Sequence, residues 1–258
     1  MTTIEVDGAR VEYRQLGAGR DLVLLHSLLT DLTVFDDLAP VLGRTRRVTL
    51  LNLPGYGASA PIAPGIERCA DHVAAAMRAL ALPRQTDVFG NGFGGFTALA
   101  LAIRHGARFD RLLIADALAA FPAEGKTPFQ AMAARVEAEG MNAVLDTAIK
   151  RMFPDAFVAA HPDVIAARKA ALAKADASAF AGACRALAAL DFVPLLGTIR
   201  NPTLVMVGAL DATTAPQPAR RLADGIAGCR FELIEECGHC PMLEKPRELL
   251  ALMNGFLG

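Results

Sequence analysis

The segment Val88-Phe89-Gly90-Asn91-Gly92-Phe93-Gly94-Gly95-Phe96 places a cluster of glycines where a short apolar run gives way to a helical pattern. Glycine accepts backbone conformations that other residues resist, and its missing side chain allows segments to approach closely. A strand that turns sharply into a helix needs both properties. The segment therefore predicts a tight strand–turn–helix unit.

Two kinds of site use such a turn. Gly90-x-Gly92-x-x-Gly95 matches the dinucleotide-binding pattern G-x-G-x-x-G, and the next predicted strand is followed by Asp116, at about the spacing of a ribose-binding acid. This match indicates an NAD(P)-dependent oxidoreductase. The other kind is a nucleophile elbow, G-x-S-x-G, with Gly92 in place of the serine.

Short apolar runs alternate with helical patterns along the rest of the chain. Asp7-Gly8 is typical of a tight hairpin turn, so the chain is expected to begin with two antiparallel strands. The later runs are continuously apolar, as in strands buried on both faces of a parallel sheet. The expected strands are 4–6, 11–13, 21–25, 47–51, 86–89, 111–115, 203–207 and 230–234, and the expected helices are 66–81, 94–106, 215–225 and 245–257. This order predicts an α/β fold with an open, mostly parallel eight-stranded sheet.

The alternation stops between residues 120 and 190. This stretch has no convincing strand, is rich in alanine and is interrupted by Gly and Pro. Strand-like residues resume at 203. We therefore expect residues 1–119 and 191–258 to form the sheet domain and residues 120–190 to form an inserted helical cap.

An acid and a histidine, each just after one of the later strands, distinguish the two interpretations of the turn. Asp211 lies just past the run that ends at Val207, and His239 lies just past the last predicted strand. Elbow, then acid, then histidine is the chain order of hydrolases that carry their nucleophile on such an elbow. A dinucleotide turn normally follows the first strand of its unit, whereas several strands precede Gly92. The elbow is favoured, and the oxidoreductase remains a third hypothesis.

The chain resembles α/β-hydrolase-fold proteins over essentially its whole length. The segment 52–59, Asn-Leu-Pro-Gly-Tyr-Gly-Ala-Ser, is similar to the family's D-x-P-G-x-G-x-S loop, with Asn52 where Asp is usual. The segments 208–211 and 238–246 resemble its acid and histidine motifs, and 139–184 is similar to the cap of 3-oxoadipate enol-lactonases.

This resemblance implies hydrolysis of a small carboxylic ester or lactone. His239 would be the base and Asp211 would orient it, while the main-chain N–H groups of Leu28 and Phe93 would hold the oxyanion. The pocket would be lined by residues next to these groups, namely His26, Ser27, Asn91 and Asp116. No cofactor or metal ion is expected.

Gly92 has no side chain with which to attack a substrate, and three explanations stay open. The chain is a variant disabled by loss of one serine; or His239 and Asp211 activate a water or move a substrate proton in the space that the hydroxyl left; or the chain is a pseudoenzyme that only binds its ligand. Ser27 is near the expected oxyanion hole but mispositioned for attack along the elbow direction.

The remaining polar candidates have ordinary structural interpretations. His26 is expected to hydrogen-bond local backbone, Ser59 to satisfy its loop, and Glu244 to hold the loop after His239. Asp116 is a reserve acid or a pocket residue. The cap arginines could meet a substrate carboxylate, although solvation is their default role; they are Arg135, Arg151 and Arg168.

Composition excludes several classes of protein. The chain has 258 residues, 53% hydrophobic and 21% charged, with a net charge of -1. Disorder needs lower hydrophobicity and more net charge, and nucleic-acid binders usually carry a basic surface. No apolar run approaches the length that spans a bilayer, and the N-terminus lacks a secretion signal. Five scattered cysteines indicate reduced thiols in the cytoplasm. The expected partner is a small organic ester or lactone, without nucleic acid or membrane, and the chain could form a homodimer.

Overall fold

A single eight-stranded sheet organises the computed structural model, which describes residues 2–258. The strand order is β1-β2-β4-β3-β5-β6-β7-β8. β1 and β2 are antiparallel to their neighbours, and all other pairs are parallel. The strands are β1 (Thr2–Val6), β2 (Ala9–Leu16), β3 (Arg20–Leu25), β4 (Arg46–Leu51), β5 (Asp87–Asn91), β6 (Leu112–Ala115), β7 (Thr203–Gly208) and β8 (Arg230–Ile234).

The predicted fold class is confirmed in its sheet. Each expected run forms a strand, and the hairpin turns where both Asp7 and Gly8 adopt positive φ, 49° and 79°. Positive φ at both central residues is the turn that matches the twist of paired strands. β3, β5, β6 and β7 are buried almost throughout, which explains their continuous apolar sequence.

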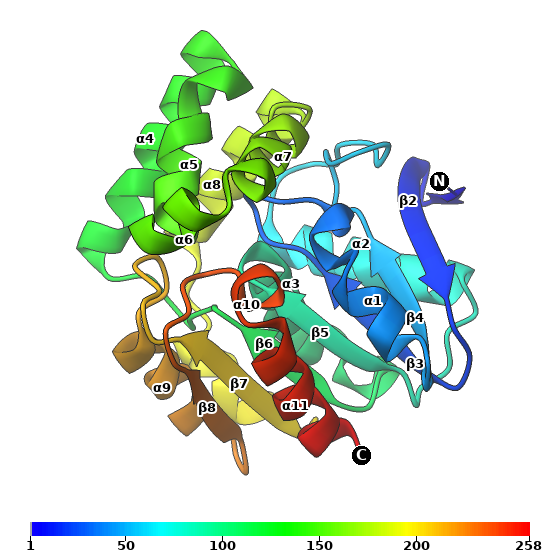
Figure 1. The fold of residues 1–258 in the computed structure, drawn as a ribbon. Coiled ribbons are helices and arrows are strands. Elements are labelled where there is room, and N and C mark those ends of the chain that lie inside the picture. The colour runs from blue at the N-terminus through cyan, green and yellow to red at the C-terminus, as the bar shows by residue number, and fades with distance from the viewer. Residues whose placement is uncertain (1) are drawn as a thin grey trace.

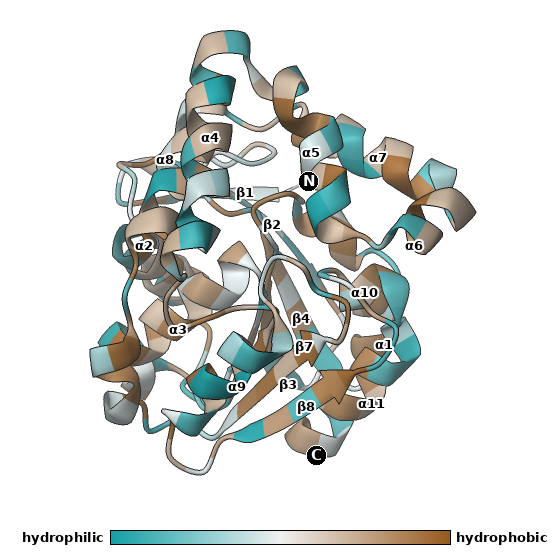
Figure 2. Ribbon diagram, turned by 90° about the vertical axis from the view of Figure 1, so that its left-hand side faces the viewer, coloured by the Kyte–Doolittle hydropathy of each residue, from teal (hydrophilic) through white to brown (hydrophobic). Residues whose placement is uncertain are grey.

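Helices cover both faces of this sheet. α2 (Ile66–Ala79) and α3 (Phe93–His105) pack together on one face, while α1 (Leu38–Leu42) and α11 (Pro246–Leu257) contact each other on the opposite face. Figure 2 shows the two helical faces on either side of the sheet, with brown strands between them. α9 (Pro216–Asp224) packs on β7, and the short α10 (Pro241–Glu244) precedes α11. Four short 3₁₀ turns complete the connections: 32–35, 106–108, 141–144 and 193–198.

A separate group of helices lies between β6 and β7 in the chain. We call residues 123–189 the helical layer; its helices are α4 (Ala123–Glu139), α5 (Leu145–Met152), α6 (Asp155–Ala160), α7 (Pro162–Leu172) and α8 (Ala177–Ala189). The layer lies beyond one end of the sheet, above it in Figure 1, with α4 packed against α8. The chain enters and leaves it through an antiparallel bridge between Ala120 and Asp191.

The helices of residues 2–258 include none that is both long enough and apolar enough to cross a bilayer.

Candidate active site

The glycine-rich turn joins β5 to α3 and packs directly on β3. Gly92 has φ 52° and ψ -118°, a left-handed conformation that is strained for side chains other than glycine. A Cβ at Gly90 would lie 2.2 Å from the carbonyl oxygen of Gly94, and one at Gly94 would lie 2.2 Å from that of Leu25. These glycines are therefore required by contacts within the protein, where β3, β5 and α3 meet.

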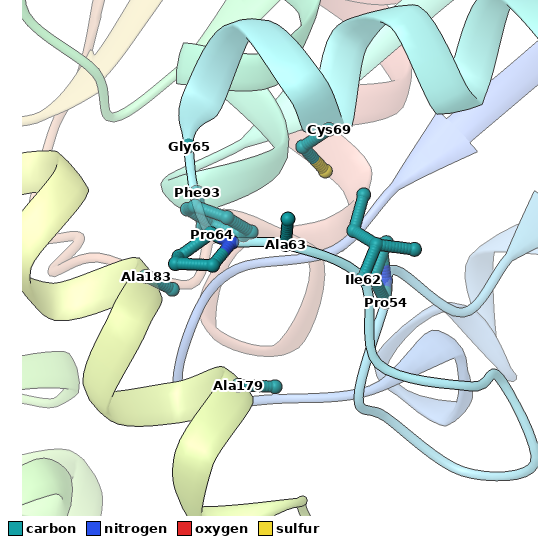
Figure 3. A pocket seen from close by; sticks show the side chains of 9 residues that line it. All are labelled: Pro54, Ile62, Ala63, Pro64, Gly65, Cys69, Phe93, Ala179 and Ala183. Carbon is teal, nitrogen blue, oxygen red and sulfur yellow. The ribbon is translucent and has the colours of Figure 1, made fainter.

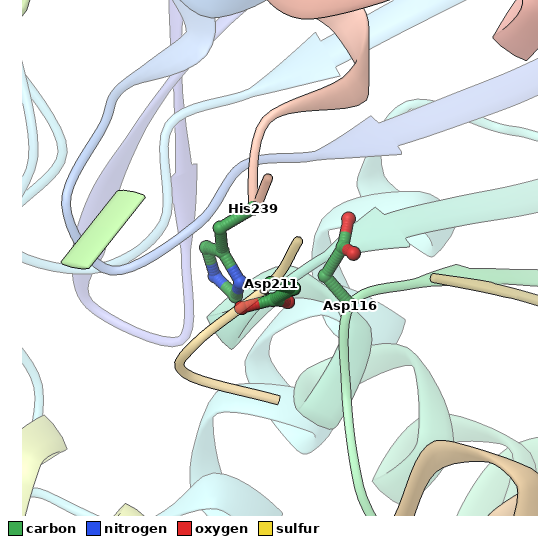
Figure 4. Close-up of side chains that lie close together, drawn as sticks. All are labelled: Asp116, Asp211 and His239. Carbon is green, nitrogen blue, oxygen red and sulfur yellow. Dashed lines mark hydrogen bonds and ion pairs between the residues drawn. The ribbon is translucent and has the colours of Figure 1, made fainter. Parts of the chain in front are cut away.

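His239 and Asp211 lie beside this turn, on the loops after β8 and β7. His239 Nδ1 is 2.8 Å from Asp211 Oδ2, and both side chains are buried. Figure 4 shows the imidazole directed toward the Asp211 carboxylate. A carboxylate on Nδ1 fixes the tautomer that leaves Nε2 free to accept a proton. The pair thus has the geometry of a histidine base with its orienting acid.

The carboxylate of Asp211 is held by further donors that the sequence had not suggested. Oδ1 accepts hydrogen bonds from Thr213 N at 2.7 Å and Thr214 N at 3.0 Å, and the Thr214 hydroxyl donates to Oδ2. An acid followed by threonines two and three positions later is typical of an Asx turn, so the signal was present. Burial alone would raise the pKa of Asp211, but the charge and hydrogen bond of His239 and the bonds from Thr214 lower it to about 2.

This pKa predicts an acid-sensitive contribution to stability. A carboxyl whose folded-state pKa lies below its unfolded value of about 4 stabilises the native state above pH 4. That contribution, about 2–3 kcal/mol at 1.4 kcal/mol per pKa unit, is lost as the pH falls from 4 toward 2. Urea unfolding of wild type and Asp211→Asn between pH 5 and pH 2 measures it. The difference in unfolding free energy should shrink by about that amount, and a constant difference would contradict the assignment.

The loop that carries His239 is fixed on each side of the histidine. Glu244 accepts hydrogen bonds from Gly238 N at 2.7 Å and from Cys240 N at 2.9 Å. His239 N itself donates to the carbonyl oxygen of Met152, at the end of α5, at 2.9 Å. The expectation that Glu244 holds this loop agrees with these bonds, whereas the tie to the helical layer was not foreseen.

The space above Gly92 is occupied. A Cβ built on Gly92 would lie 2.3 Å from Ser27 Oγ and 2.7 Å from His239 Nε2, far inside contact distance. Ser27 Oγ lies 3.3 Å from His239 Nε2. The hydroxyl of Ser27 therefore fills the position that one of the three explanations gives to a water.

Two main-chain N–H groups adjoin this position without an internal acceptor. Gly94 N donates to the carbonyl oxygen of His26 at 2.9 Å, which ties the start of α3 to the loop after β3. Leu28 and Phe93 belong to these two segments, and within residues 2–258 neither of their N–H groups donates to a main-chain carbonyl. Uncommitted N–H groups of this kind are what an oxyanion hole requires.

Asp116 and Asn91 lie beneath the site with no exposed surface. Asp116 accepts hydrogen bonds from Gly208 N at 2.9 Å and from Asn91 Nδ2 at 2.9 Å, and Asn91 Nδ2 also donates to the carbonyl of His239. Burial, with the negative charge of Asp211, raises the pKa of Asp116 well above its usual value and favours its neutral form. A carboxyl enclosed in this way does not offer the ribose contact that a dinucleotide site needs.

Asp116, Asp211 and His239 also bring their ligand-type atoms within 4.8 Å of one another, as a metal site would. Their hydrogen bonds argue against that use. Both oxygens of Asp116 accept from N–H groups, and His239 Nδ1 is bonded to Asp211. Hydrogens directed at these atoms would repel a cation, so the cluster does not fit a metal ion.

His26 is a fully buried residue that orders two loops. Burial lowers its pKa to about 4, so the ring is neutral at pH 7. Nε2 accepts from Leu53 N at 3.0 Å, which leaves Nδ1 to donate to the carbonyl oxygen of Ser27 at 2.8 Å. The ring thus bonds local backbone on both sides and holds the main chain of Ser27. Ser59 does the same for its own loop, since Oγ accepts from Glu12 N and donates to the carbonyl of Asn52.

A small apolar pocket of about 30 Å³ adjoins the site between α8 and the loop that precedes α2. Figure 3 shows Phe93 on its wall, next to Ala183 and Pro64. Gly92, Ser27 and His239 do not line it. The pocket therefore adjoins the polar cluster, by which we mean Ser27, His239 and Asp211, only through Phe93. Ser27 and His239 themselves are only 1% and 4% exposed. The polar cluster is closed in this structure, and a substrate must displace part of its cover.

The three arginines of the helical layer differ in their surroundings. Arg135 is exposed and lies 3.7 Å from Glu139, and Arg168 donates to Thr33 Oγ1 at 3.0 Å. The Arg151 guanidinium lies over the ring of Phe129, 5.2 Å from its centroid, and within residues 2–258 its buried Nε has no hydrogen-bond partner. Burial lowers the pKa of Arg151, and the nearby charge of Asp211 opposes this effect. Arg151 is therefore a half-buried cation that has no paired carboxylate among residues 2–258.

Comparisons with known proteins agree with this architecture. Residues 22–252 match the profile of the Alpha/beta hydrolase family. The chain is 29% identical to 3-oxoadipate enol-lactonase 2 of Acinetobacter baylyi, over 88% of this chain and 84% of that protein. It is 28% identical to the pimeloyl-[acyl-carrier protein] methyl ester esterase of Aeromonas hydrophila, over 96% and 99%. The crystal structure of the enol-lactonase from Burkholderia xenovorans LB400 superposes with a TM-score of 0.93, at 28% identity and 99% coverage of both chains.

Proposed function

Because this chain belongs to the alpha/beta hydrolase family, we propose that it hydrolyses a small carboxylic ester or lactone. Its relatives include enzymes named as an enol-lactonase and as a methyl ester esterase, which share the ester linkage as their target. The observation that carries the proposal is the His239–Asp211 pair, whose free Nε2 faces a hydroxyl beside two uncommitted N–H groups.

Each group has a role in this reaction. His239 Nε2 takes the proton of the attacking hydroxyl and later gives it to the leaving alcohol. Asp211 holds the ring in the required tautomer and stabilises the imidazolium while it carries that proton. The N–H groups of Leu28 and Phe93 stabilise the negative charge that develops on the carbonyl oxygen. None of these roles needs a side chain at position 92.

The helical layer would act as the cap over this chemistry. It places Arg151 near Asp211 without an ion-pair partner. A half-buried guanidinium is stabilised by a bidentate carboxylate, and the layer would open to admit a ligand that carries one. The proposed substrate is therefore an ester or lactone with a second, free carboxylate.

Two esters that differ in charge test this substrate class. Wild type is expected to hydrolyse mono-p-nitrophenyl glutarate and p-nitrophenyl butyrate, with the lower KM for the charged ester. Arg151→Gln should raise KM for the charged ester about 10-fold or more, since charge-assisted hydrogen bonds contribute about 1.5–3 kcal/mol, and should leave the neutral ester nearly unchanged.

The exposed Arg135→Gln is the matched control and should change neither KM. An equal effect of Arg151→Gln on both esters would contradict the carboxylate role. Saturable binding of such esters or of small lactones without turnover would instead favour a ligand-binding protein.

A cytoplasmic location is also proposed. Its support is the composition, with five scattered cysteines and no pairing pattern.

A further inference from the structure

We propose that Ser27 is the nucleophile of this protein and takes over the role that the elbow residue cannot fill. This inference rests on the proposed ester or lactone hydrolysis. It assigns the covalent step to the loop after β3, in place of the turn between β5 and α3.

The first support is the position of the hydroxyl. Ser27 Oγ lies 3.3 Å from His239 Nε2, whose other ring nitrogen is bonded to Asp211 at 2.8 Å. A hydroxyl, an imidazole and a carboxylate in this sequence form a nucleophile–base–acid relay. The Oγ–Nε2 distance is long for a hydrogen bond, as it often is before substrate binds.

The second support is the dependence of this arrangement on glycine at position 92. A Cβ there would lie 2.3 Å from Ser27 Oγ and 2.9 Å from Ser27 Cβ. Any other residue at 92 would force Ser27 away from its present place. The present position of Ser27 beside His239 therefore depends on the absence of a side chain at position 92.

The third support is that the oxyanion donors keep their function. On an elbow, one donor is the N–H after the nucleophile and the other comes from the loop after β3. With Ser27 as nucleophile, Leu28 becomes the residue after it and Phe93 supplies the donor from the opposite loop. The bond from Gly94 N to the carbonyl of His26 keeps the two loops together.

The main chain of Ser27 is held so that only its side-chain rotation remains free. Its carbonyl oxygen accepts from His26 Nδ1 at 2.8 Å and from both Thr30 N and Thr30 Oγ1 at 3.2 Å. A fixed backbone with one rotatable hydroxyl is a suitable basis for attack, because little freedom must be lost.

The reaction then balances as a double displacement. His239 Nε2 takes the proton of Ser27 Oγ while Oγ bonds to the carbonyl carbon, and the carbonyl electron pair moves to the oxygen held by Leu28 and Phe93. The ester C–O bond breaks, and His239 returns the proton to the leaving alcohol. Water then attacks the acyl-Ser27 ester and gives a proton to His239. The C–Oγ bond breaks, and Ser27 recovers its proton as the acid leaves.

Covalent trapping tests the assignment. A short-chain alkyl fluorophosphonate, which forms an Oγ–P bond and releases fluoride, is incubated with the intact protein, and peptides are mapped by mass spectrometry. We expect the adduct on Ser27 in wild type and in the exposed control Ser178→Ala. It should be absent in Ser27→Ala and at least 10-fold slower to form in His239→Gln. Ester turnover should fall about 10³-fold in Ser27→Ala, with circular dichroism confirming its fold.

A second variant keeps the test decisive if Ser27→Ala is unstable. Ser27→Cys retains a nucleophile beside His239, which can take the proton of its thiol, so peptide mapping should find iodoacetamide modification at position 27. The native thiols at 69, 184, 237 and 240 have no such base beside them, and the partly exposed Cys229 is distinguished by its own peptide. Failure of position 27 to react in both the serine and the cysteine forms would overturn the proposal.

The outcomes separate this inference from the proposed function. If wild type hydrolyses esters while Ser27→Ala retains its rate within about threefold and no adduct forms on Ser27, the nucleophile is a water and hydrolysis stands. An adduct on Ser27 without ester turnover supports the nucleophile and contradicts hydrolysis. Neither adduct nor turnover contradicts both.

Discussion

The double variant Gly92→Ser/Ser27→Gly is expected to hydrolyse short p-nitrophenyl esters about 10²-fold or more faster than Ser27→Gly alone. The new serine sits on the strained turn whose following N–H is that of Phe93. His239 Nε2 lies 2.7 Å from its Cβ, so the ring must shift slightly to receive the hydroxyl. Covalent attack from such a position is worth several orders of magnitude in rate. Steady-state kinetics on p-nitrophenyl acetate and butyrate, with both single variants, measure the effect.

The substitution Gly92→Ser alone should raise the rate of ester hydrolysis by less than it does when Ser27 is replaced by glycine as well. Its Cβ would collide with Ser27 Oγ at 2.3 Å, and the His239 ring must also move from 2.7 Å. Replacing Ser27 by glycine removes one of these two clashes. The effects of the two substitutions should therefore be strongly non-additive, as for residues in direct contact. Additive effects, or an inactive double variant that is folded, would contradict the packing described above Gly92.

The second large effect is expected at the histidine. His239→Gln should lower kcat/KM for esters about 10³-fold, because general base catalysis contributes 10²- to 10⁴-fold and no other imidazole contacts Ser27 Oγ within residues 2–258. The loss should appear mainly in kcat, since His239 acts on a proton that moves only during reaction.

The exposed His161→Gln provides the matched control, and its kinetics should equal those of wild type. Glutamine at 239 keeps the volume of the side chain, so the variant is expected to remain folded. If the rate of His239→Gln stayed within tenfold of wild type, His239 would not be the base that activates the nucleophile, whether that nucleophile is Ser27 or a water. The proposed mechanism would then be wrong for both nucleophiles.

Much of the sheet could be predicted from local sequence. Strands buried on both faces must be continuously apolar, and the Asp7-Gly8 turn needs residues that accept positive φ. The spacing of Asp211 and His239 after their strands anticipated that they would meet. The short helices 38–42 and 241–244 were missed, because a helix of one turn has too few residues to show a periodic pattern.

Only the site residues that directly follow a predicted strand could be placed from the sequence. Gly92 indicates that the elbow has no side chain, and the sequence alone leaves open whether the position of that side chain is empty or holds a water. What fills that position depends on loops from β3 and β8, whose residues 27 and 239 are far apart in the chain. The enclosure of Asp116 and the orphaned Nε of Arg151 likewise arise from tertiary packing, which periodicity does not encode.

The bond from His239 N to the carbonyl of Met152 has a consequence for how this protein can be modified or can diversify. Because the loop that carries His239 and the last turn of α5 share this hydrogen bond, the sheet domain alone does not hold His239 in its present place. Segment 123–189 is therefore a poor candidate for exchange as an independent module. If this segment were replaced by that of another family member, the new segment would have to place a carbonyl oxygen where that of Met152 now accepts from His239 N. Without that contact, His239 would not be held for any new substrate.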